Sequence, residues 1–132
     1  MPTKNWQKAE SDFSEAFELW GKQAFVHRLT DTRAARNFVA AQPSDYLVTV
    51  NGETFYAEVK STQDVKAFHF SNIRKQQMAK SRMIAKAGGL YFFFIKSEHL
   101  GQWYCIPAQI VHNHPVKHLT WIELEPYKYD PS

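Results

Sequence analysis

Residues 43–60 have the sequence PSDYLVTVNGETFYAEVK, in which two runs rich in aromatic and β-branched residues flank Asn51-Gly52. An Asn-Gly pair between two such runs is the strongest short-range signal for a β-hairpin. A two-residue turn also determines the register of the two strands. The pattern therefore predicts three opposed pairs: Val50 with Glu53, Val48 with Phe55, and Asp45 with Glu58.

The hairpin brings two acids and one base to a single point. Directly opposed residues project from the same side of a sheet with Cβ atoms about 5 Å apart, and Lys60, two residues beyond Glu58, shares that side. Facing carboxylates repel each other unless a cation lies between them, and oxygen ligands suit Mg²⁺ or Mn²⁺. A lysine there can orient the attacking water or stabilise charge on phosphorus. The ordinary alternative is a solvated Glu–Lys pair, but the register favours a site.

Length and composition indicate one globular domain spanning residues 1–132, with loose ends at about 1–10 and 126–132. Hydrophobic residues make up 44% of the chain and the net charge is +3, which supports nucleic-acid binding only weakly. The single cysteine, Cys105, permits no internal disulfide and suggests a reducing compartment. The N-terminus lacks an apolar run, and Leu90–Ile95 is too short to span a bilayer. We therefore expect a cytoplasmic protein without membrane contact.

The remaining pattern predicts an α/β order of elements. Apolar residues at helical spacing favour a helix over residues 11–29, with Ser11 as its N-cap. A short strand is expected at 38–40, then the hairpin at 45–60 and a polar connection over 61–70. Ser71 or Asn72 is expected to cap a second helix that runs to about 87, where Gly88-Gly89 ends it. The later expectations are a buried central strand at 90–95, a strand at 102–106, a short helix at 107–111 and an edge strand at 119–124.

The second helix has two contrasting sides. Helical spacing groups one set of residues on the side that faces the sheet, namely Ile73, Gln77, Lys80, Ile84 and Ala87. Another side carries Lys75, Arg82 and Lys86, with Arg74 nearby. This second side is either a solvated basic face or a phosphate-contacting surface beside the carboxylates.

The motif Pro43-Ser44-Asp45, followed after thirteen residues by Glu58-Val59-Lys60, resembles the PD-(D/E)xK nuclease superfamily. The run 68–73 (FHFSNI), Gln77 and Gly88-Gly89 before an apolar strand narrow the resemblance to the RecU-type Holliday junction resolvases. The resemblance spans about 14–112 and implies a restriction-endonuclease-like core, a central mixed β-sheet flanked by helices. Residues 14–18 (SEAFE) resemble the first-helix motif and identify Glu18 as a further acid of the site, with Glu15 as the alternative.

Two departures from the family pattern stand out. Longer members carry a stalk before the hairpin, whereas only about fifteen residues separate the expected first helix from Asp45. Ser14 stands where the family usually has glycine. The chain therefore resembles a minimal, stalkless form, for which the mode of engaging the junction centre is open.

The resemblance implies a homodimer that cuts opposed strands of a four-way DNA junction by paired symmetric nicks, in recombination and repair within a bacterial, archaeal or phage-infected cell. Asp45, Glu58 and the Val59 carbonyl would hold Mg²⁺ or Mn²⁺, with Glu18 nearby. A water positioned by Lys60 would attack in line, leaving a 5′-phosphate and a 3′-hydroxyl, and Gln77 would orient the water or a phosphate. Candidate DNA contacts are Lys22, Arg28, Arg33, Arg36, Lys66, His69, Arg74, Lys75 and Arg82.

Two other functions remain open. One is a different endonuclease of the superfamily, of the nicking, restriction or repair type. The other is a nucleic-acid-binding protein that does not cleave, which the complete Asp45, Glu58 and Lys60 set argues against. A zinc site from His112, His114, His118 and Cys105 has little support, because their spacing matches no finger pattern.

Overall fold

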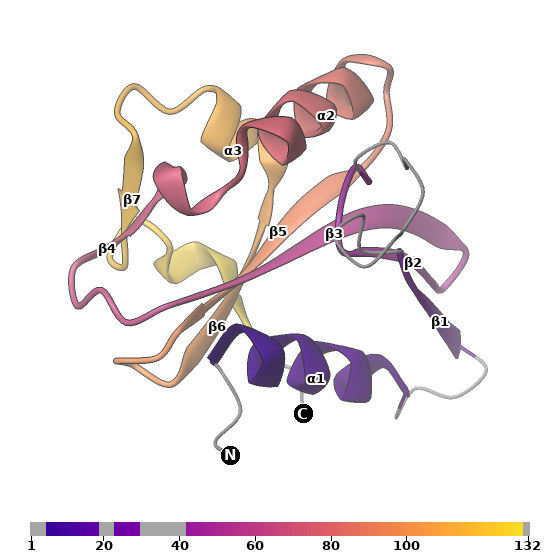
Figure 1. Cartoon of the computed structure of the whole chain (residues 1–132), viewed down its shortest axis with the longest axis horizontal. Coiled ribbons are helices and arrows are strands. Elements are labelled where there is room, and N and C mark those ends of the chain that lie inside the picture. Colours follow the sequence, from indigo (N-terminus) through magenta and orange to yellow (C-terminus); the bar gives the residue numbers. More distant parts are fainter. Residues whose placement is uncertain (1–4, 19–22, 30–41, 131–132) are drawn as a thin grey trace, which may run out of the picture.

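The computed structural model describes residues 5–18, 23–29 and 42–130. Its helices are α1 (Asn5–Glu18), α2 (Lys75–Lys86) and α3 (Ala108–His112), with short 3-10 turns η3 (Phe70–Asn72) and η4 (Glu125–Tyr127). The strands are β1 (Ala24–Arg28), β2 (Tyr46–Val50), β3 (Glu53–Thr62), β4 (Ala67–His69), β5 (Tyr91–Ser97), β6 (Gln102–Pro107), β7 (His118–Thr120) and β8 (Lys128–Tyr129). Figure 1 shows these elements along the chain.

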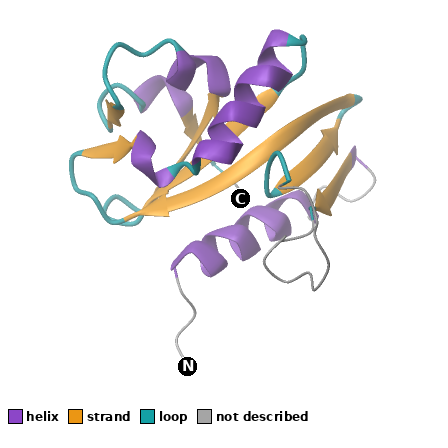
Figure 2. Cartoon of the chain, turned by 45° about the horizontal axis from the view of Figure 1, so that its top comes forward, coloured by secondary structure: helices purple, strands orange, loops and turns teal. Residues whose placement is uncertain are grey.

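A six-stranded sheet in the order β1-β2-β3-β5-β6-β8 forms the centre of the molecule, and β4 and β7 form a separate two-stranded sheet. The pairing of β3 with β5 is parallel, and the other pairings in the large sheet are antiparallel. Helix α1 covers one face of the sheet, whereas α2 and α3 lie on the other (Figures 1 and 2). The predicted mixed sheet flanked by helices is therefore confirmed.

Each face of the sheet has its own hydrophobic core. On the α1 side, Phe13 and Phe17 pack against a set of strand residues that includes Val48, Val59 and Phe94. The core on the opposite side contains Tyr91, Phe93, Ile95, Tyr104 and Ile106, with residues of α3, β4 and β7. Ala57 and Val59 of β3 belong to the core on the α1 side. Because strand side chains alternate between faces, Glu58 and Lys60 project toward the α2 side.

The predicted hairpin and its register are confirmed. Asn51 and Gly52 adopt φ angles of 50° and 82°, the left-handed conformation that a type I′ turn requires at both central positions. The strands pair as expected, with Val50 opposite Glu53 and Val48 opposite Phe55. The turn therefore sets which residues of β2 and β3 meet on the α2 face.

The Gly88-Gly89 pair ends α2 and leads into β5. Gly88 has φ +88°, which a residue with a side chain rarely adopts, and a Cβ at Gly89 would lie 2.8 Å from Ile84 Cγ2. The following strand, β5, lies inside the sheet between β3 and β6, as its continuous apolar sequence predicted.

The predicted first helix is wrong in its bounds. The helix begins at Asn5, so Ser11 lies inside it rather than at its N-cap, and it ends at Glu18. Residues 24–28 form β1, which pairs with β2 along its length. The pairing with β2 is a tertiary interaction that overrides the local helical spacing. The strand expected at 38–40 falls outside the described residues.

Three further boundaries differ from expectation. The polar connection contains β4, and Ser71 and Asn72 belong to η3, so α2 begins after Arg74. The strand expected at 119–124 is β7, over 118–120, and it pairs with β4 rather than forming an edge of the large sheet. That edge is β8, which pairs with β6. The ends expected to be loose thus contribute part of α1 and the strand β8.

Candidate active site

Asp45 and Glu58 meet as the hairpin predicts, and each binds the other's backbone segment. The Asp45 N–H donates a hydrogen bond to Glu58 Oε1 at 3.0 Å, and the Val59 N–H donates to Asp45 Oδ2 at 2.9 Å. Glu58 is 1% exposed. The two carboxylates are therefore held side by side at a largely buried point, just before β2 begins.

Lys60 completes the cluster. Its Nζ lies 3.1 Å from Glu58 Oε2, and its side chain is largely buried. Two carboxylates with one ammonium carry a net negative charge when both acids are ionised. Burial, followed by the charge of Asp45, raises the pKa of Glu58 to about 8, and burial also raises the pKa of Asp45. Without a further cation, the acid pair thus retains a proton near neutral pH.

The Val59 carbonyl points toward the same place. The N–H and C=O of one strand residue point to the same neighbouring strand, and this direction alternates along the strand. The Tyr56 N–H donates to Leu90 O on the β5 side, whereas the Val59 N–H donates to Asp45. The Val59 carbonyl therefore lies on the Asp45 side of β3, beyond the start of β2.

These donors fit a hard divalent cation. Asp45 Oδ2 accepts from the Val59 N–H, Glu58 Oε1 accepts from the Asp45 N–H, and Glu58 Oε2 lies beside Lys60 Nζ. The two acidic side chains also share a hydrogen bond, so their oxygens are close together. A carboxylate oxygen and a backbone carbonyl are ligands that Mg²⁺ and Mn²⁺ accept. A bound cation would also offset the charge of Asp45, which, after burial, raises the pKa of Glu58.

Gln77 is buried on α2 with an unsatisfied acceptor. Its side chain is 8% exposed, and Oε1 has no hydrogen-bond partner among the described residues. Buried polar atoms are nearly always paired, so an orphaned one indicates a missing partner such as water. The inward orientation expected for Gln77 is confirmed, but Lys80 is exposed, and Ser81 occupies the buried side instead.

The structure describes six of the nine residues predicted to contact DNA. Burial raises the pKa of Asp45, and the positive charge of Arg74, which precedes α2, offsets a small part of that rise. Arg28, Lys66, His69, Arg74, Lys75 and Arg82 are all exposed. His69 Nε2 lies 3.2 Å from Asp64 Oδ2, so this side chain already has an acidic partner. Lys22, Arg33 and Arg36 fall outside the described residues.

Glu18 is the last residue of α1, and its side chain is not among the described ones. Glu15, the alternative, is exposed on the same helix. Helix α1 packs against the face of the sheet opposite to Asp45 and Glu58. The contribution of Glu18 stays a prediction.

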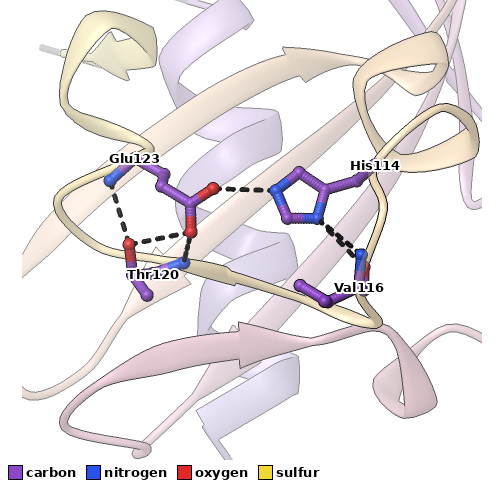
Figure 3. A network of polar contacts seen from close by, with 4 residues as sticks. All are labelled: His114, Val116, Thr120 and Glu123. Carbon is purple, nitrogen blue, oxygen red and sulfur yellow. Dashed lines mark hydrogen bonds and ion pairs between the residues drawn. The ribbon is translucent and has the colours of Figure 1, made fainter.

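The histidines make separate contacts. His114 Nε2 lies 2.7 Å from Glu123 Oε2, while Glu123 Oε1 accepts hydrogen bonds from the Thr120 N–H and hydroxyl (Figure 3). His112 Nε2 lies 2.8 Å from the Ser81 hydroxyl, and the His118 ring lies beside His69. Burial raises the pKa of Cys105 to about 12. Within the described ranges, no group of three His, Cys, Asp or Glu residues could hold a metal ion.

Tyr91 is a residue near the site that the sequence did not indicate. It is buried at the start of β5, and its hydroxyl donates a hydrogen bond to the Pro43 carbonyl. Burial, followed by the charges of Glu58 and Asp45, raises its pKa. Its position directly after Gly88-Gly89-Leu90 is the one sequence signal that could have drawn attention to it.

Comparison with known proteins establishes the family. The sequence matches the family described as Recombination protein U, RecU, over residues 26–125. The chain belongs to the RecU family. The resemblance that the motifs predicted is therefore confirmed, and RecU membership supports an endonuclease of the Holliday junction resolvase class. No curated protein matches the sequence.

Solved structures resemble this RecU-family chain in fold. One is the Holliday junction resolvase Hjc of Archaeoglobus fulgidus, with a TM-score of 0.62 and 16% identity, covering 92% of this chain and 93% of that one. Another is a bacterial homing endonuclease, with a TM-score of 0.52 and 12% identity, covering 91% of this chain and 75% of that one. Both folds are restriction-endonuclease-like, which confirms the predicted fold class. None of the described helices is sufficiently long and apolar to cross a membrane.

Proposed function

We propose that this RecU-family chain is a metal-dependent endodeoxyribonuclease that resolves four-way DNA junctions. The observation that supports it most strongly is the reciprocal bonding of Asp45 and Glu58 beside Lys60. An ordinary surface Glu–Lys pair would be solvated, whereas Glu58 is almost completely buried against a second carboxylate. Such an arrangement is costly without a cation and therefore indicates a site.

Asp45, Glu58 and the Val59 carbonyl would hold Mg²⁺ or Mn²⁺, and Glu18 would contribute directly or through water. When bound, the cation would supply Lewis-acid polarisation of the phosphodiester and would lower the pKa of a water. The protein's part is to fix the oxygen ligands in advance. The hairpin register and the two backbone hydrogen bonds do this without help from flexible side chains.

Lys60 and Gln77 have different proposed roles. Lys60 places three N–H donors beside the carboxylates, where it would orient the attacking water and offset charge on the phosphorus centre. Gln77 Oε1 is a buried acceptor with no partner among the described residues, and it would accept a hydrogen bond from that water. The in-line attack would leave a 5′-phosphate and a 3′-hydroxyl.

The exposed side of α2 would bind the phosphate backbone of DNA next to the site. Helix α2 has no acidic residue, and Lys75, Arg82 and Lys86 are exposed along one side of it. Arg74, at its start, is close enough to Asp45 to influence its pKa. A continuous basic face that ends at the carboxylates would position a backbone without reading bases, as recognition of a branched structure requires.

A homodimer would explain paired cutting. A four-way junction presents two opposed strands of equivalent geometry, while each chain provides one cluster of Asp45, Glu58 and Lys60. Two copies related by a two-fold axis would therefore place one site on each strand and give symmetric nicks. The name of the similar archaeal structure, a Holliday junction resolvase, supports this choice of substrate.

The test is denaturing-gel mapping of an end-labelled four-way junction, alongside a linear duplex containing the same arm sequences. With Mg²⁺, the proposal expects symmetric nicks in two opposed arms and little cutting of the duplex. Equal cutting of both substrates would favour a nicking, restriction or repair nuclease. Junction binding without any cutting in Mg²⁺ or Mn²⁺ would favour a protein that binds but does not cleave.

A further inference from the structure

Tyr91 occupies a buried position beside the carboxylates. It begins β5, is 1% exposed, and lies opposite Tyr56 in the parallel pairing of β3 with β5. The two rings stack with centroids 6.1 Å apart and an interplanar angle of 17°. Because Tyr56 precedes Glu58 by two residues on the same strand, both project from the α2 face of the sheet. Tyr91 therefore lies next to Glu58 on that face.

The Tyr91 side chain reaches across β3. The strand order places β3 between β2 and β5, yet the Tyr91 hydroxyl donates a hydrogen bond to the carbonyl of Pro43, in the segment that leads into β2. Burial, followed by the charges of Glu58 and Asp45, raises the pKa of Tyr91. The phenol therefore stays protonated and acts as the donor in this contact.

The segment that Tyr91 contacts needs such an anchor. Regular pairing of β2 with β3 begins at Tyr46, so Pro43 to Asp45 lie outside the ladder. Pro43 has no N–H to donate. The Ser44 hydroxyl bonds the Tyr46 carbonyl, and the Asp45 carbonyl accepts from the Leu29 N–H. The contact from Tyr91 adds a connection from this segment to β5, across the strand that carries Glu58.

We propose that Tyr91 is a positioning residue for the cation site. It holds the Pro43–Asp45 segment against β3, so that the Asp45 carboxylate stays opposite Glu58, without itself touching the cation or DNA. This inference rests on the proposed function of the carboxylates. Groups that orient metal ligands typically change metal affinity or activity by about 10- to 100-fold when removed. Loss of the Tyr91 hydroxyl should therefore weaken cation binding about tenfold.

Tyr91→Phe is the variant that tests this role, and Tyr104→Phe is its matched control. Tyr104 belongs to the same hydrophobic core and stacks on Trp121, with ring centroids 5.4 Å apart. Its hydroxyl has no hydrogen-bond partner among the described residues. Both substitutions remove one buried hydroxyl and retain the ring, but the Tyr91 hydroxyl alone is bonded to the segment that carries Asp45.

Three measurements on each protein separate positioning from general destabilisation: the melting midpoint without metal, the rise in that midpoint with Mn²⁺, and the Mg²⁺ dependence of junction cleavage. Binding and cleavage are measured well below the lowest melting midpoint. We expect Tyr91→Phe to need about tenfold more Mn²⁺ and Mg²⁺ for half-maximal effect, with cleavage largely recovered at saturating Mg²⁺. Tyr104→Phe should retain the wild-type metal midpoints.

Unchanged metal midpoints in Tyr91→Phe would overturn the inference, even if its melting midpoint without metal fell, because the hydroxyl would then act only in folding. An equal shift in Tyr104→Phe would overturn it as well. The Mn²⁺ binding measurement contains no DNA. It therefore decides the role of Tyr91 separately from junction cleavage, whose absence in the wild-type protein would refute the proposed function instead.

Discussion

The backbone N–H of Asp45 donates to the carboxylate of Glu58 at 3.0 Å, so the position of one acid is defined by the main chain of the other. The Asp45 carboxylate in turn accepts from the Val59 N–H at 2.9 Å. This reciprocal arrangement has a practical consequence. An amide in place of either acid keeps an oxygen that can accept the same hydrogen bond, so charge can be removed while the local geometry is retained.

Asp45→Asn and Glu58→Gln should each lower the rate of junction cleavage by at least about 10²-fold. Each change removes a charged ligand but leaves the hairpin intact. The melting midpoint without metal should stay unchanged or rise, because the substitution removes one of two facing buried carboxylates. Single-turnover cleavage and thermal unfolding check the two parts of the prediction.

Junction affinity provides the control for these variants. Measured without metal, it should remain within a few fold of wild type, since the proposed phosphate contacts are other residues. Wild-type cleavage that persists in excess chelator would contradict the metal-dependent role of both acids.

Lys60→Met should separate cation binding from cleavage. The apolar stem is retained, but the ammonium 3.1 Å from Glu58 Oε2 is lost. We expect the Mn²⁺-induced rise in the melting midpoint to survive, because the oxygen ligands remain, while cleavage falls by about 10²-fold or more. Loss of Mn²⁺ binding together with cleavage would instead make Lys60 part of the structure of the site.

Gln77→Leu should increase the stability of the protein and lower the rate of cleavage. The amide oxygen of Gln77 is buried and unsatisfied within the described chain. Replacing it with an apolar group of similar size removes an uncompensated polar atom and should stabilise the protein by up to about 1 kcal/mol. Cleavage should fall nonetheless, because no acceptor remains for the water. A destabilised variant with full activity would show that Gln77 serves packing alone.

The double substitution Lys75→Gln and Arg82→Gln should weaken binding to the junction and to non-specific duplex alike. Each lost phosphate contact reduces the slope of log affinity against log salt concentration by about 1. Lys128→Gln serves as the control, because Lys128 lies on the edge strand β8 and is already ion-paired to Glu125. An unchanged salt slope in the double variant would place the DNA on another surface.

The contact between His114 and Glu123 should give a limited window of pH-dependent stability. Hydrogen bonds to Val116 and Glu123 raise the pKa of His114, so its contribution is complete below pH 6.5 and is lost as the pH rises through the folded-state pKa. The bond from His114 and those from Thr120 lower the pKa of Glu123 from 4.5 to about 2, so its contribution is lost as the pH falls through that range. The contact is therefore strongest between about pH 4.5 and 6.5.

Glu123→Gln tests this window. The melting difference between wild type and variant should be largest near pH 5.5 and should shrink on either side. In an NMR titration, the pKa of His114 should return toward 6.5 in the variant. An unshifted titration would show that Glu123 does not stabilise the charged imidazole.

The hairpin and the acid pair could be predicted from sequence because the information is local. The Asn51-Gly52 turn specifies a type I′ conformation, and that conformation alone sets which residues of β2 and β3 face each other. The buried strand β5 was also accessible, since it is a continuous apolar run that Gly88-Gly89 precedes.

The errors arose where partners distant in sequence decide the structure. Phe13 and Phe17 are core residues of α1, but the same spacing continued into Ala24, which belongs to β1 because β2 lies beside it. Likewise, Lys128–Tyr129 becomes an edge strand because β6 offers an unpaired side. The contact of Tyr91 with Pro43 joins residues 48 positions apart, so no local sequence pattern predicts it.

Isothermal titration of Mn²⁺ into the metal-free protein, compared with Asp45→Asn, tests the central claim most directly. The wild-type protein should bind Mn²⁺ with release of protons, because burial raises the pKa values of both acids and the charge of Asp45 raises that of Glu58 further. Asp45→Asn should lose most of that binding. Equal binding by the two proteins, or none by the wild type, would contradict a cation site formed by Asp45 and Glu58.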